Sequence, residues 1–540
     1  MSESPADVAV PLTKKEKIIL FFLPNVGDII FIFFLQIPLF LRPSFLFGDG
    51  STGWHLVAGD FILQTHQIPY HDLFSYTHPD APWVAYEWLS DLLMAFAVKL
   101  GGLNLLAVCC GCSIGWLLIL LYGRCRKEGA HVLLALLLVV IGTLVTAVHW
   151  LARPHLFTFF GIYLFTTRLE DYYRGEIGKL QLLIPLTLFM LLWVNTHPAF
   201  LFGFALMGIY LFSSLVVSWF QFFGSGAPVA PGMEKISNHR RERVKWIALS
   251  MVACGAATLV NPYGTHLYSY IAQYLKGNSV LAATDEFLSP VFHGTLQPVC
   301  LELLFGAFIV GLAMGVNRLT LPRLLTCLAF GHLVLSAVRN MPLYAIVILP
   351  AISLLLAKVA WPSFAGSSQL VAKWRAGSRG FDENESMCNS HIWPMAIFVF
   401  LSIASLNGGK LFGADVISCS WGHKDKPSAT LEYLSKEEAA KRLDPNHGFN
   451  YDNWGGYIRY RLGTRVFIDD RADFYGENFY TRYSVISLVQ PGWKKLLDEY
   501  KVQWILMPKN SRLGAALADE PDWHKASSDD ASALFVRNSP

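Results

Sequence analysis

The polar stretch that decides the fold begins with G-D-G-S-T-G-W-H at Gly48–His55. It continues as I-P-Y-H-D-L-F-S-Y-T-H over Ile68–His78 and as W-V-A-Y-E-W-L-S-D over Trp83–Asp91. Within Asp49–Glu87 the chain carries five carboxylates and four histidines, whereas the flanking segments are largely apolar. We therefore interpret this stretch as a loop that carries a functional site.

The composition around this loop is that of a membrane protein. The 540 residues are 53% apolar and 15% charged, with a mean hydropathy of +0.39. Soluble proteins carry about 25% charged residues, so this chain is expected to bury its apolar surface in lipid. The net charge of +3 gives no argument for a nucleic-acid partner. The nine cysteines form no repeated C-x-x-C pair, so neither a zinc site nor a disulfide framework is expected.

Apolar runs close to the roughly 20 residues that cross a bilayer recur along the chain. We predict about eleven spans, at Ile18–Leu41, Leu103–Tyr122, His131–Val148, Leu156–Thr167, Leu180–Val194, Phe200–Phe220, Trp246–Val260, Leu301–Val316, Leu321–Val338, Met341–Leu356 and Ile392–Leu406. Trp83–Leu100 is predicted to be a shorter helix at the membrane interface.

Every second loop carries a cluster of basic residues, and this asymmetry predicts the orientation. The clusters are Lys14/Lys15/Lys17, Arg124/Arg126/Lys127, Arg168/Arg174/Lys179, Arg240/Arg241/Arg243/Lys245, Arg318/Arg323 and Lys373/Arg375/Arg379. We expect a cytoplasmic tail over residues 1–17, a membrane domain over 18–406 and a first outer loop over 42–102. The segment 407–540 is then also outside. We expect the protein to lie in the cytoplasmic (inner) membrane, with this segment on its extracytoplasmic face.

On this topology, the remaining unusual polar motifs all lie at the outer face. They are Arg153-Pro154-His155, Asn195-Thr196-His197-Pro198, Asn261-Pro262-Tyr263-Gly264, Asp285-Glu286 and Arg339-Asn340-Met341-Pro342. Ionisable groups at membrane depth are costly and are normally paired or functional. Their position predicts a polar cavity covered by the first loop.

Asp49 is the candidate catalytic residue. A carboxylate at the membrane edge can take a proton from an acceptor hydroxyl as a general base. Asp72 and Glu87 are candidates for positioning the acceptor, or for sharing a divalent cation with Asp49 or His55, and His55 is also a candidate for binding substrate. The alternatives are a loop aspartate or helix cap for Asp49, a turn after Pro69 for Asp72, and a helix cap for Glu87. No metal site is predicted firmly, but Asp49, His55 and Asp72 have oxygen and nitrogen ligands that would suit Mg²⁺ or Mn²⁺.

The basic residues of the outer motifs suit a phosphate. Arg153 and Arg339 offer the fixed fork of donors that phosphate oxygens accept. His155 and His197 are further candidates for binding substrate, as are two amide side chains in the same motifs, Asn195 and Asn340. An anchoring role at a helix end is the alternative for Arg339, and a satisfied buried histidine is the alternative for His197.

The last 130 or so residues change character. Strands are predicted at Gly456–Leu462, Val466–Ile468, Val502–Met507 and Ala533–Val536, and helices at Ala429–Arg442 and Pro491–Tyr500. The motifs W-G-G-Y at Trp454–Tyr457 and I-D-D-R-A-D-F-Y at Ile468–Tyr475 stand out. Either they form a sugar-binding surface, or they form a glycine turn and a structural Asp–Arg pair; we favour the second interpretation.

Taken together, the acidic loop after the first span, the interface helix and the many further spans resemble the GT-C superfamily of polytopic glycosyltransferases. The motifs G-D-x-x-x-G-W-H, R-P-H, W-x-N-x-H, N-P-Y-G and R-N-x-P-L resemble a set of large, mostly uncharacterised bacterial membrane proteins assigned to the same fold. The resemblance implies that Asp49 is the acidic residue of the first loop that acts as catalytic base. The adjacent acidic pair of many GT-C members is absent here, because Gly50 follows Asp49.

We therefore predict a mainly α, polytopic helical bundle with its N-terminus inside, its C-terminus outside and a C-terminal α/β domain. The resemblance implies an inverting glycosyltransferase that uses a polyprenyl-phosphate-linked sugar donor and an acceptor that is a protein, lipid or polysaccharide. The alternatives are a non-catalytic assembly subunit with a C-terminal binding domain and a transporter of lipid-linked sugars.

Overall fold

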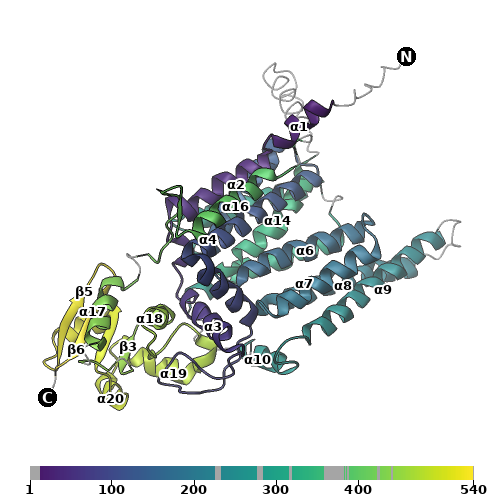
Figure 1. Ribbon diagram of the computed structural model, residues 1–540. Helices are drawn as coiled ribbons and strands as arrows, with labels where there is room; N and C mark the ends of the chain where they lie inside the picture. Colours follow the sequence, from purple (N-terminus) through teal and green to yellow (C-terminus); the bar gives the residue numbers. More distant parts are fainter. Residues whose placement is uncertain are drawn as a thin grey trace, which may run out of the picture.

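The computed structural model describes residues 13–224, 233–275, 284–315, 319–357, 382, 385, 388, 390–422, 426–439, 442–444 and 446–538. Most of the predicted N-terminal tail and the basic cluster at 373–379 lie outside these residues. The helical bundle has α1 (Lys14–Phe22) at one end, and the C-terminal domain lies at the other end, beside α3 (Thr52–Thr65) (Figure 1).

Helices dominate the first three quarters of the chain. They are α1 (Lys14–Phe22), α2 (Val26–Gln36), α3 (Thr52–Thr65), α4 (Trp88–Lys127), α5 (Val132–Thr146), α6 (His155–Arg174), α7 (Lys179–Val194), α8 (Leu201–Gly224), α9 (Met233–Thr258), α10 (His266–Leu275), α12 (Leu296–Gly315), α13 (Leu321–Ser336), α14 (Met341–Leu356) and α16 (Ile392–Leu406). The mainly α fold class is therefore confirmed.

Every predicted span overlaps a helix, but the helices differ in length. Within the described residues, six helical segments are long and apolar enough to cross a membrane. They are Ile18–Leu41, Trp88–Lys127, Val132–His149, Pro198–Val217, Leu296–Met314 and Val338–Leu356. This establishes a multi-pass membrane protein, while eleven crossings remain a prediction.

Both boundaries predicted for the interface helix, Trp83 and Leu100, are wrong. It begins at Trp88, because Trp83 instead packs in the loop against Phe74, with ring centroids 5.4 Å apart. It also continues into the next span as the single helix α4, with a break at Gly101 and Gly102, where Gly102 has a φ of +64°. The two glycines permit a change of direction, so one helix serves as both predicted elements.

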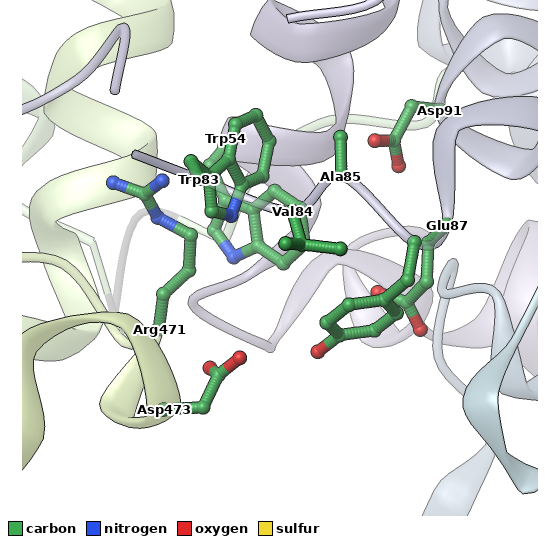
Figure 2. A pocket seen from close by; sticks show the side chains of 9 residues that line it. Trp54, Trp83, Val84, Ala85, Glu87, Asp91, Arg471 and Asp473 are labelled. Carbon is green, nitrogen blue, oxygen red and sulfur yellow. The ribbon is translucent and has the colours of Figure 1, made fainter. Parts of the chain in front are cut away.

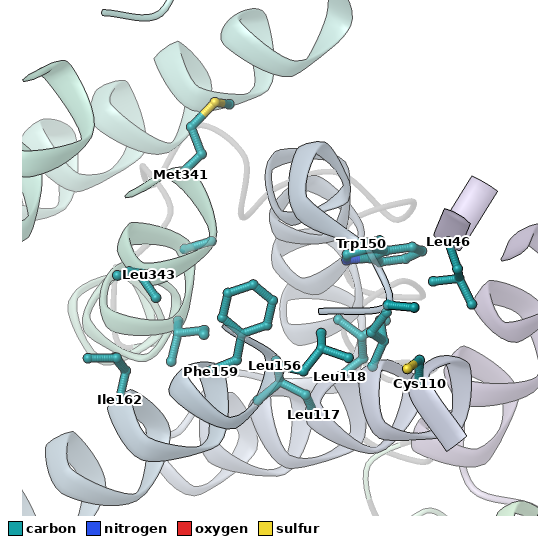
Figure 3. Close-up of a cluster of buried hydrophobic side chains, with 14 of the residues drawn as sticks. Leu46, Cys110, Leu117, Leu118, Trp150, Leu156, Phe159, Ile162, Met341 and Leu343 are labelled. Carbon is teal, nitrogen blue, oxygen red and sulfur yellow. The ribbon is translucent and has the colours of Figure 1, made fainter. Parts of the chain in front are cut away.

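The bundle is held by close packing between helices far apart in sequence. Figure 3 shows Leu118 of α4, Leu156 and Phe159 of α6 and Leu343 of α14 around one buried cluster, with Trp150 at its side. The indole Nε1 of Trp150 donates to the Thr146 hydroxyl at 3.2 Å, so the buried ring has no unpaired donor.

Ion pairs join α4, α6 and α13 at the end of the bundle remote from the C-terminal domain. Arg124 contacts Asp171 at 2.6 Å and Glu128 at 2.7 Å. Arg323 also reaches Glu128, at 3.0 Å, and Arg174 contacts Glu170 at 2.7 Å. Part of the basic charge that predicts the orientation is therefore neutralised inside the protein.

The C-terminal part contains a small α/β unit. It comprises β3 (Gly448–Asn450), β4 (Trp504–Pro508), β5 (Trp523–Ser528) and β6 (Ser532–Arg537), with helices α17 (Ser428–Ala439), α18 (Gly455–Leu462), α19 (Ala472–Ser487), α20 (Trp493–Glu499) and α21 (Arg512–Ala518). A short hairpin, β1 (Lys410–Leu411) and β2 (Ala414–Asp415), precedes it. The order of the sheet is β3-β4-β6-β5; β3 pairs parallel with β4, and the other pairs are antiparallel.

Two of the four predicted strands are wrong. Gly456–Leu462 is the helix α18, and Val466–Ile468 contributes only a single bridge between Val466 and Ser75. The predictions for β4, β6, α17 and α20 are confirmed. In α18 the side chains of Tyr457 and Ile458 are buried against the rest of the protein, so tertiary packing overrides the apparent alternation.

The first loop and the C-terminal domain meet where two glycines face each other. A Cβ on Gly53 of α3 would lie 2.4 Å from the main-chain carbon of Gly456, and a Cβ on Gly456 would lie 2.9 Å from the main-chain nitrogen of Trp54. Gly456 does not have a positive φ, contrary to the glycine-turn interpretation. These glycines instead allow α3 and α18 to touch along their main chains.

Replacing Gly456 with alanine should therefore loosen this contact. We expect Gly456→Ala to destabilise the protein by about 1–3 kcal/mol, because the new methyl meets main-chain atoms that cannot rotate away. Thermal unfolding in detergent should show a lower Tm, and limited proteolysis should release the C-terminal domain sooner. Gly123→Ala in α4, where a Cβ meets nothing within 4 Å, is the control. Equal Tm values for the two variants would refute this account of the interface.

Candidate functional site

A chain of alternating charges occupies the end of the bundle that faces the C-terminal domain. Arg153 Nε lies 3.3 Å from Asp49 Oδ2, and Arg153 Nη1 lies 3.7 Å from Glu286 Oε2. Glu286 Oε1 is 3.5 Å from Arg339 Nη1, and its Oε2 is 3.5 Å from His149 Nε2. The structure thus brings together Asp49, Arg153 and Arg339 of the predicted site residues.

These side chains come from short segments at the ends of helices. Asp49 lies between a three-residue 3-10 turn and α3, and Arg153 lies just before α6. Glu286 and Arg339 belong to the 3-10 turns Asp285–Phe287 and Val338–Asn340. Their side chains remain partly exposed, at 18% for Asp49, 23% for Arg153 and 28% for Arg339, so a ligand can reach them.

The surroundings of Asp49 favour its charged form. Burial alone would raise the pKa of Asp49, but Arg153, the Ser51 hydroxyl and Lys426 together hold that pKa below its ordinary value. Ser51 donates both its hydroxyl and its main-chain N–H to Asp49 Oδ2, while the Lys426 ammonium donates to the Asp49 carbonyl at 2.8 Å. The carboxylate is therefore oriented as an ionised acceptor.

Asp470 is a site residue that the sequence did not reveal. Burial and the charges of Asp49 and Asp469 raise the pKa of Asp470 well above its ordinary value. Within the described part of the chain, its buried Oδ1 has no hydrogen-bond partner. The C-terminal domain thus adds a carboxyl group beside Asp49 that is held protonated. The two consecutive aspartates, Asp469 and Asp470, could have indicated this site residue. Asp469 alone is enough to form the structural pair with Arg471, which leaves Asp470 for another role.

The predicted structural Asp–Arg pair lies next to it. Arg471 contacts Asp469 at 2.7 Å, and also Asp72 of the first loop at 2.6 Å. Asp72 in addition accepts from the main chain and hydroxyl of Ser75, each at 2.7 Å. Asp72 therefore fastens the loop to the C-terminal domain, and both of its oxygens are engaged.

Glu87 and His197 form a second polar pair close to the arginines. His197 Nε2 lies 3.6 Å from Glu87 Oε1, and its other ring nitrogen contacts the Thr158 hydroxyl at 2.9 Å. Burial raises the pKa of Glu87 to about 8, although Arg153 acts in the opposite direction. Glu87 is thus a neutral acid over most of the physiological pH range.

Four other predicted site residues are not themselves members of the chain of alternating charges. His55 contacts Asp91 at 2.6 Å between α3 and α4, and His155 contacts the His149 carbonyl at 2.7 Å. Asn195 accepts from the Trp88 indole at 2.9 Å, and Asn340 donates to the Leu333 carbonyl at the end of α13. In these contacts all four position the segments that carry the charged groups.

The possible metal ligands have separate partners. Asp49 is paired with Arg153, His55 with Asp91 and Asp72 with Arg471. Among the residues that the structure describes, no group of three histidine, cysteine, aspartate or glutamate side chains is arranged to hold a metal ion. These three residues therefore do not fit the Mg²⁺ or Mn²⁺ site considered from the sequence, and no catalytic step is assigned to a metal.

Beneath the first loop lies a cavity of about 10 Å³, room for about one water molecule. Figure 2 shows Trp54, Trp83 and Glu87 of the first loop on one side and Arg471 and Asp473 of the C-terminal domain on the other. The cavity covered by the first loop is thus far smaller than a substrate pocket, which commonly measures about 300–1,000 Å³.

The raised pKa of Glu87 makes a prediction about stability. Unfolding returns Glu87 to its ordinary pKa near 4.5, so between pH 4.5 and 8 the folded protein holds a proton that the unfolded chain releases. The contribution to stability is therefore lost as pH rises through this window, by up to about 1.4 kcal/mol per pH unit. Glu87→Gln should flatten the fall of Tm between pH 5 and pH 8, measured by thermal unfolding.

Glu432→Gln, at an exposed position of α17, is the matched control and should leave the pH dependence unchanged. If the Glu87→Gln variant loses stability with pH as steeply as the unaltered protein, Glu87 is already ionised in the fold and the assignment fails.

Comparisons with known proteins support the fold. No family model and no curated protein matches the sequence. Among solved structures, the oligosaccharyltransferase of Archaeoglobus fulgidus in its apo form matches with a TM-score of 0.54 and 11% identity, over 92% of this chain and 70% of that one. The same archaeal enzyme, AglB, in complex with an inhibitory peptide and a dolichol-phosphate, matches with a TM-score of 0.50 and 12% identity, over 89% and 69%.

ArnT from Cupriavidus metallidurans bound to undecaprenyl phosphate matches with a lower TM-score of 0.46 and 10% identity, over 94% of this chain and 97% of that one. At such identities the likeness concerns the fold. The long apolar helices indicate a multi-pass membrane protein, and the likeness to the archaeal oligosaccharyltransferase structures, at TM-scores of 0.54 and 0.50, shows that its fold is of the GT-C type.

Proposed function

We propose that the protein is an inverting glycosyltransferase that moves a sugar from a polyprenyl-phosphate-linked donor to an acceptor hydroxyl or amide. The observation that carries this proposal is the placement of an oriented, ionised carboxylate, Asp49, beside a partly exposed arginine at one end of a GT-C bundle. Both parts of the reaction, a base and an anion-binding group, are present within one ion-paired cluster.

Arg153 and Arg339 are the groups that would hold the donor phosphate. Both guanidinium groups share Glu286 as a partner, and their contacts with it, at 3.7 Å and 3.5 Å, are longer than those of a tight bidentate pair. Phosphate oxygens are better matched to the two forks than this single shared carboxylate. The AglB structure that contains a dolichol-phosphate supports a lipid phosphate as the ligand.

The chemistry then requires little movement of the protein. The acceptor oxygen or nitrogen attacks the anomeric carbon as the bond from that carbon to the phosphate oxygen breaks. The bonding electron pair leaves with the phosphate, where Arg153 and Arg339 stabilise the added charge. Asp49 accepts the proton of the acceptor, and the configuration at the anomeric carbon inverts.

Asp470 would assist as a neutral acid. Because it stays protonated, it adds no second negative charge to the site, and its unpartnered oxygen can accept a hydrogen bond from a substrate hydroxyl. This carboxyl group comes from the C-terminal domain, so that domain completes the site rather than only covering it.

The location follows from the basic clusters in alternate loops. We infer that the site and the C-terminal domain lie on the extracytoplasmic side of the cytoplasmic membrane, with the lipid-linked donor entering sideways between helices. The alternative functions, an assembly subunit or a transporter, do not need an ionised Asp49 beside an arginine, so they make opposite predictions for its replacement.

Asp49→Asn should fold and lose transfer, because the amide cannot accept the proton. We expect a loss of at least about a hundredfold, the usual contribution of a general base. In cells that carry the variant as their only copy, mass spectrometry of lipid extracts should show accumulation of the polyprenyl-phosphate-linked donor. Asp60→Asn, at an exposed position in α3, should leave lipid extracts like those of the unaltered strain.

An Asp49→Asn strain with unchanged lipids and glycoconjugates would remove Asp49 as the base and favour the assembly subunit. The mass of an accumulated lipid would also identify the sugar, which the structure does not.

Chelation tests the role of a divalent cation. Because Asp49, His55 and Asp72 have separate partners, we expect EDTA to leave transfer by isolated membranes within about twofold of the untreated rate. Complete loss with EDTA, restored by Mg²⁺ or Mn²⁺, would instead show that Asp49 exchanges Arg153 for a metal ion during the reaction.

A further inference from the structure

The largest space among those described is an open groove of about 1060 Å³ on the C-terminal domain. Its walls come from the 3-10 turn at Asp285, the turn before α18, the second half of α19 and the end of β4. In Figure 1 the elements α18 and α19 lie between the sheet and the bundle. The groove is therefore on the side of the domain that faces the charged site.

Most of the residues that line this groove carry a polar group, and few of them are charged. Of the described lining residues, all but Leu488, Met507 and Pro508 carry a hydroxyl, amide, carboxyl or guanidinium group. The charged ones are Asp285, Asp452 and Arg512. So few apolar side chains do not suit an acyl chain, and one guanidinium beside two carboxylates does not suit a polyanion.

The groove also lacks what extended peptides use. Met507 and Pro508 end β4 and pair with Ala533 and Ser532 of β6, whereas the ladder with β3 stops at Leu506. Because proline has no N–H, only Met507 could donate to an added strand on that side, which is too short an edge for strand addition. Peptides that do not add to a sheet edge usually dock apolar side chains into apolar pockets, and the three apolar residues here provide few such anchors. A neutral chain rich in hydroxyl groups is the remaining class.

Tyrosine side chains on the groove floor are held rigidly. The Tyr483 ring stacks on Phe449 with centroids 5.3 Å apart, and its hydroxyl contacts the Asp452 main chain at 3.1 Å. The Tyr480 hydroxyl donates to the Asp469 carbonyl at 3.3 Å. Tyr480 and Tyr483 are 8% and 6% exposed, so they form a rigid base for the groove rather than a stacking surface. The half-buried Tyr451 is the lining tyrosine whose ring can contact the C–H side of a sugar, while the neighbouring amides and hydroxyls bind its polar edge.

The groove touches the charged site at three places. Asn453, which lines the groove, lies against Gly50, because a Cβ on Gly50 would be 2.6 Å from the Asn453 carbonyl oxygen. Asp285 lines the groove, whereas the next residue, Glu286, pairs with Arg153. Tyr480 bonds to the residue that precedes Asp470. A chain lying in the groove thus ends beside Asp49.

We propose that this groove binds the acceptor, and that the acceptor is a neutral saccharide chain whose terminal hydroxyl is presented to Asp49. The inference rests on the proposed glycosyl transfer and narrows its acceptor to one class. The hydroxyl then supplies the nucleophile of the reaction, and its proton passes to Asp49.

Site-specific photo-cross-linking in cells tests the class of the occupant. The full-length protein would carry p-benzoylphenylalanine at Ser487 or at Asn510, both on the groove, or at Asn478, an exposed position of α19 outside it. After irradiation, purification and digestion, mass spectrometry would identify the adduct. We expect sugar-unit mass increments at Ser487 and Asn510, at least fivefold above those at Asn478.

Adducts made of amino acids would overturn the proposal in favour of a protein acceptor. Adducts no more frequent at Ser487 and Asn510 than at Asn478 would show that the groove is not the acceptor site. Repeating the experiment in the Asp49→Asn background separates this proposal from the catalytic one. If saccharide adducts persist in the Asp49→Asn variant, they support the groove as the acceptor site, whether or not the variant has lost transfer. If the variant loses transfer and no saccharide adducts form, the result supports only the catalytic role of Asp49.

Discussion

The arrangement of the site depends on the ion pairs that the buried guanidinium of Arg471 makes. It bonds to Asp469 of its own segment and to Asp72 of the first loop, and it lies over the Phe74 ring at 4.1 Å. Its side chain is 3% exposed, and both carboxylates are fully buried, so removing Arg471 would leave two buried charges uncompensated, at a cost of about 3–5 kcal/mol. Two residues 399 positions apart are thereby fixed together, and Asp470 is held beside Asp49 as a result.

The charged cluster is balanced rather than strongly positive. Two arginines face two ionised carboxylates, Asp49 and Glu286, while Asp470 and Glu87 remain neutral because of burial. Burial would raise the pKa of Glu286, yet His149, Arg153 and Arg339 together lower it. Such an arrangement holds donors and acceptors in place before any ligand arrives, so little reorganisation accompanies the development of charge.

The sequence predicts the helical bundle and the small sheet domain because apolar length and β-branched runs are strong local signals. It also predicts that Asp49, Arg153 and Arg339 lie at the same end of the helical bundle, because the predicted membrane topology places all three segments on the outer face. It does not predict Asp470, whose neighbour Asp469 has an evident structural partner. It also misassigns Gly456–Leu462, because the close approach to Gly53 is a tertiary constraint that leaves no mark on local periodicity.

The dependence on the C-terminal domain has a consequence for biosynthesis. Asp470 and Arg471 follow the last apolar helix of the bundle, Ile392–Leu406, by more than 60 residues. The charged cluster is therefore incomplete while the bundle is being inserted, and it closes only when the end of the chain has been made and has folded against the first loop. A polypeptide truncated before residue 470 would keep its membrane helices and Asp49, yet it would lack the carboxyl group and the clamp that finish the site.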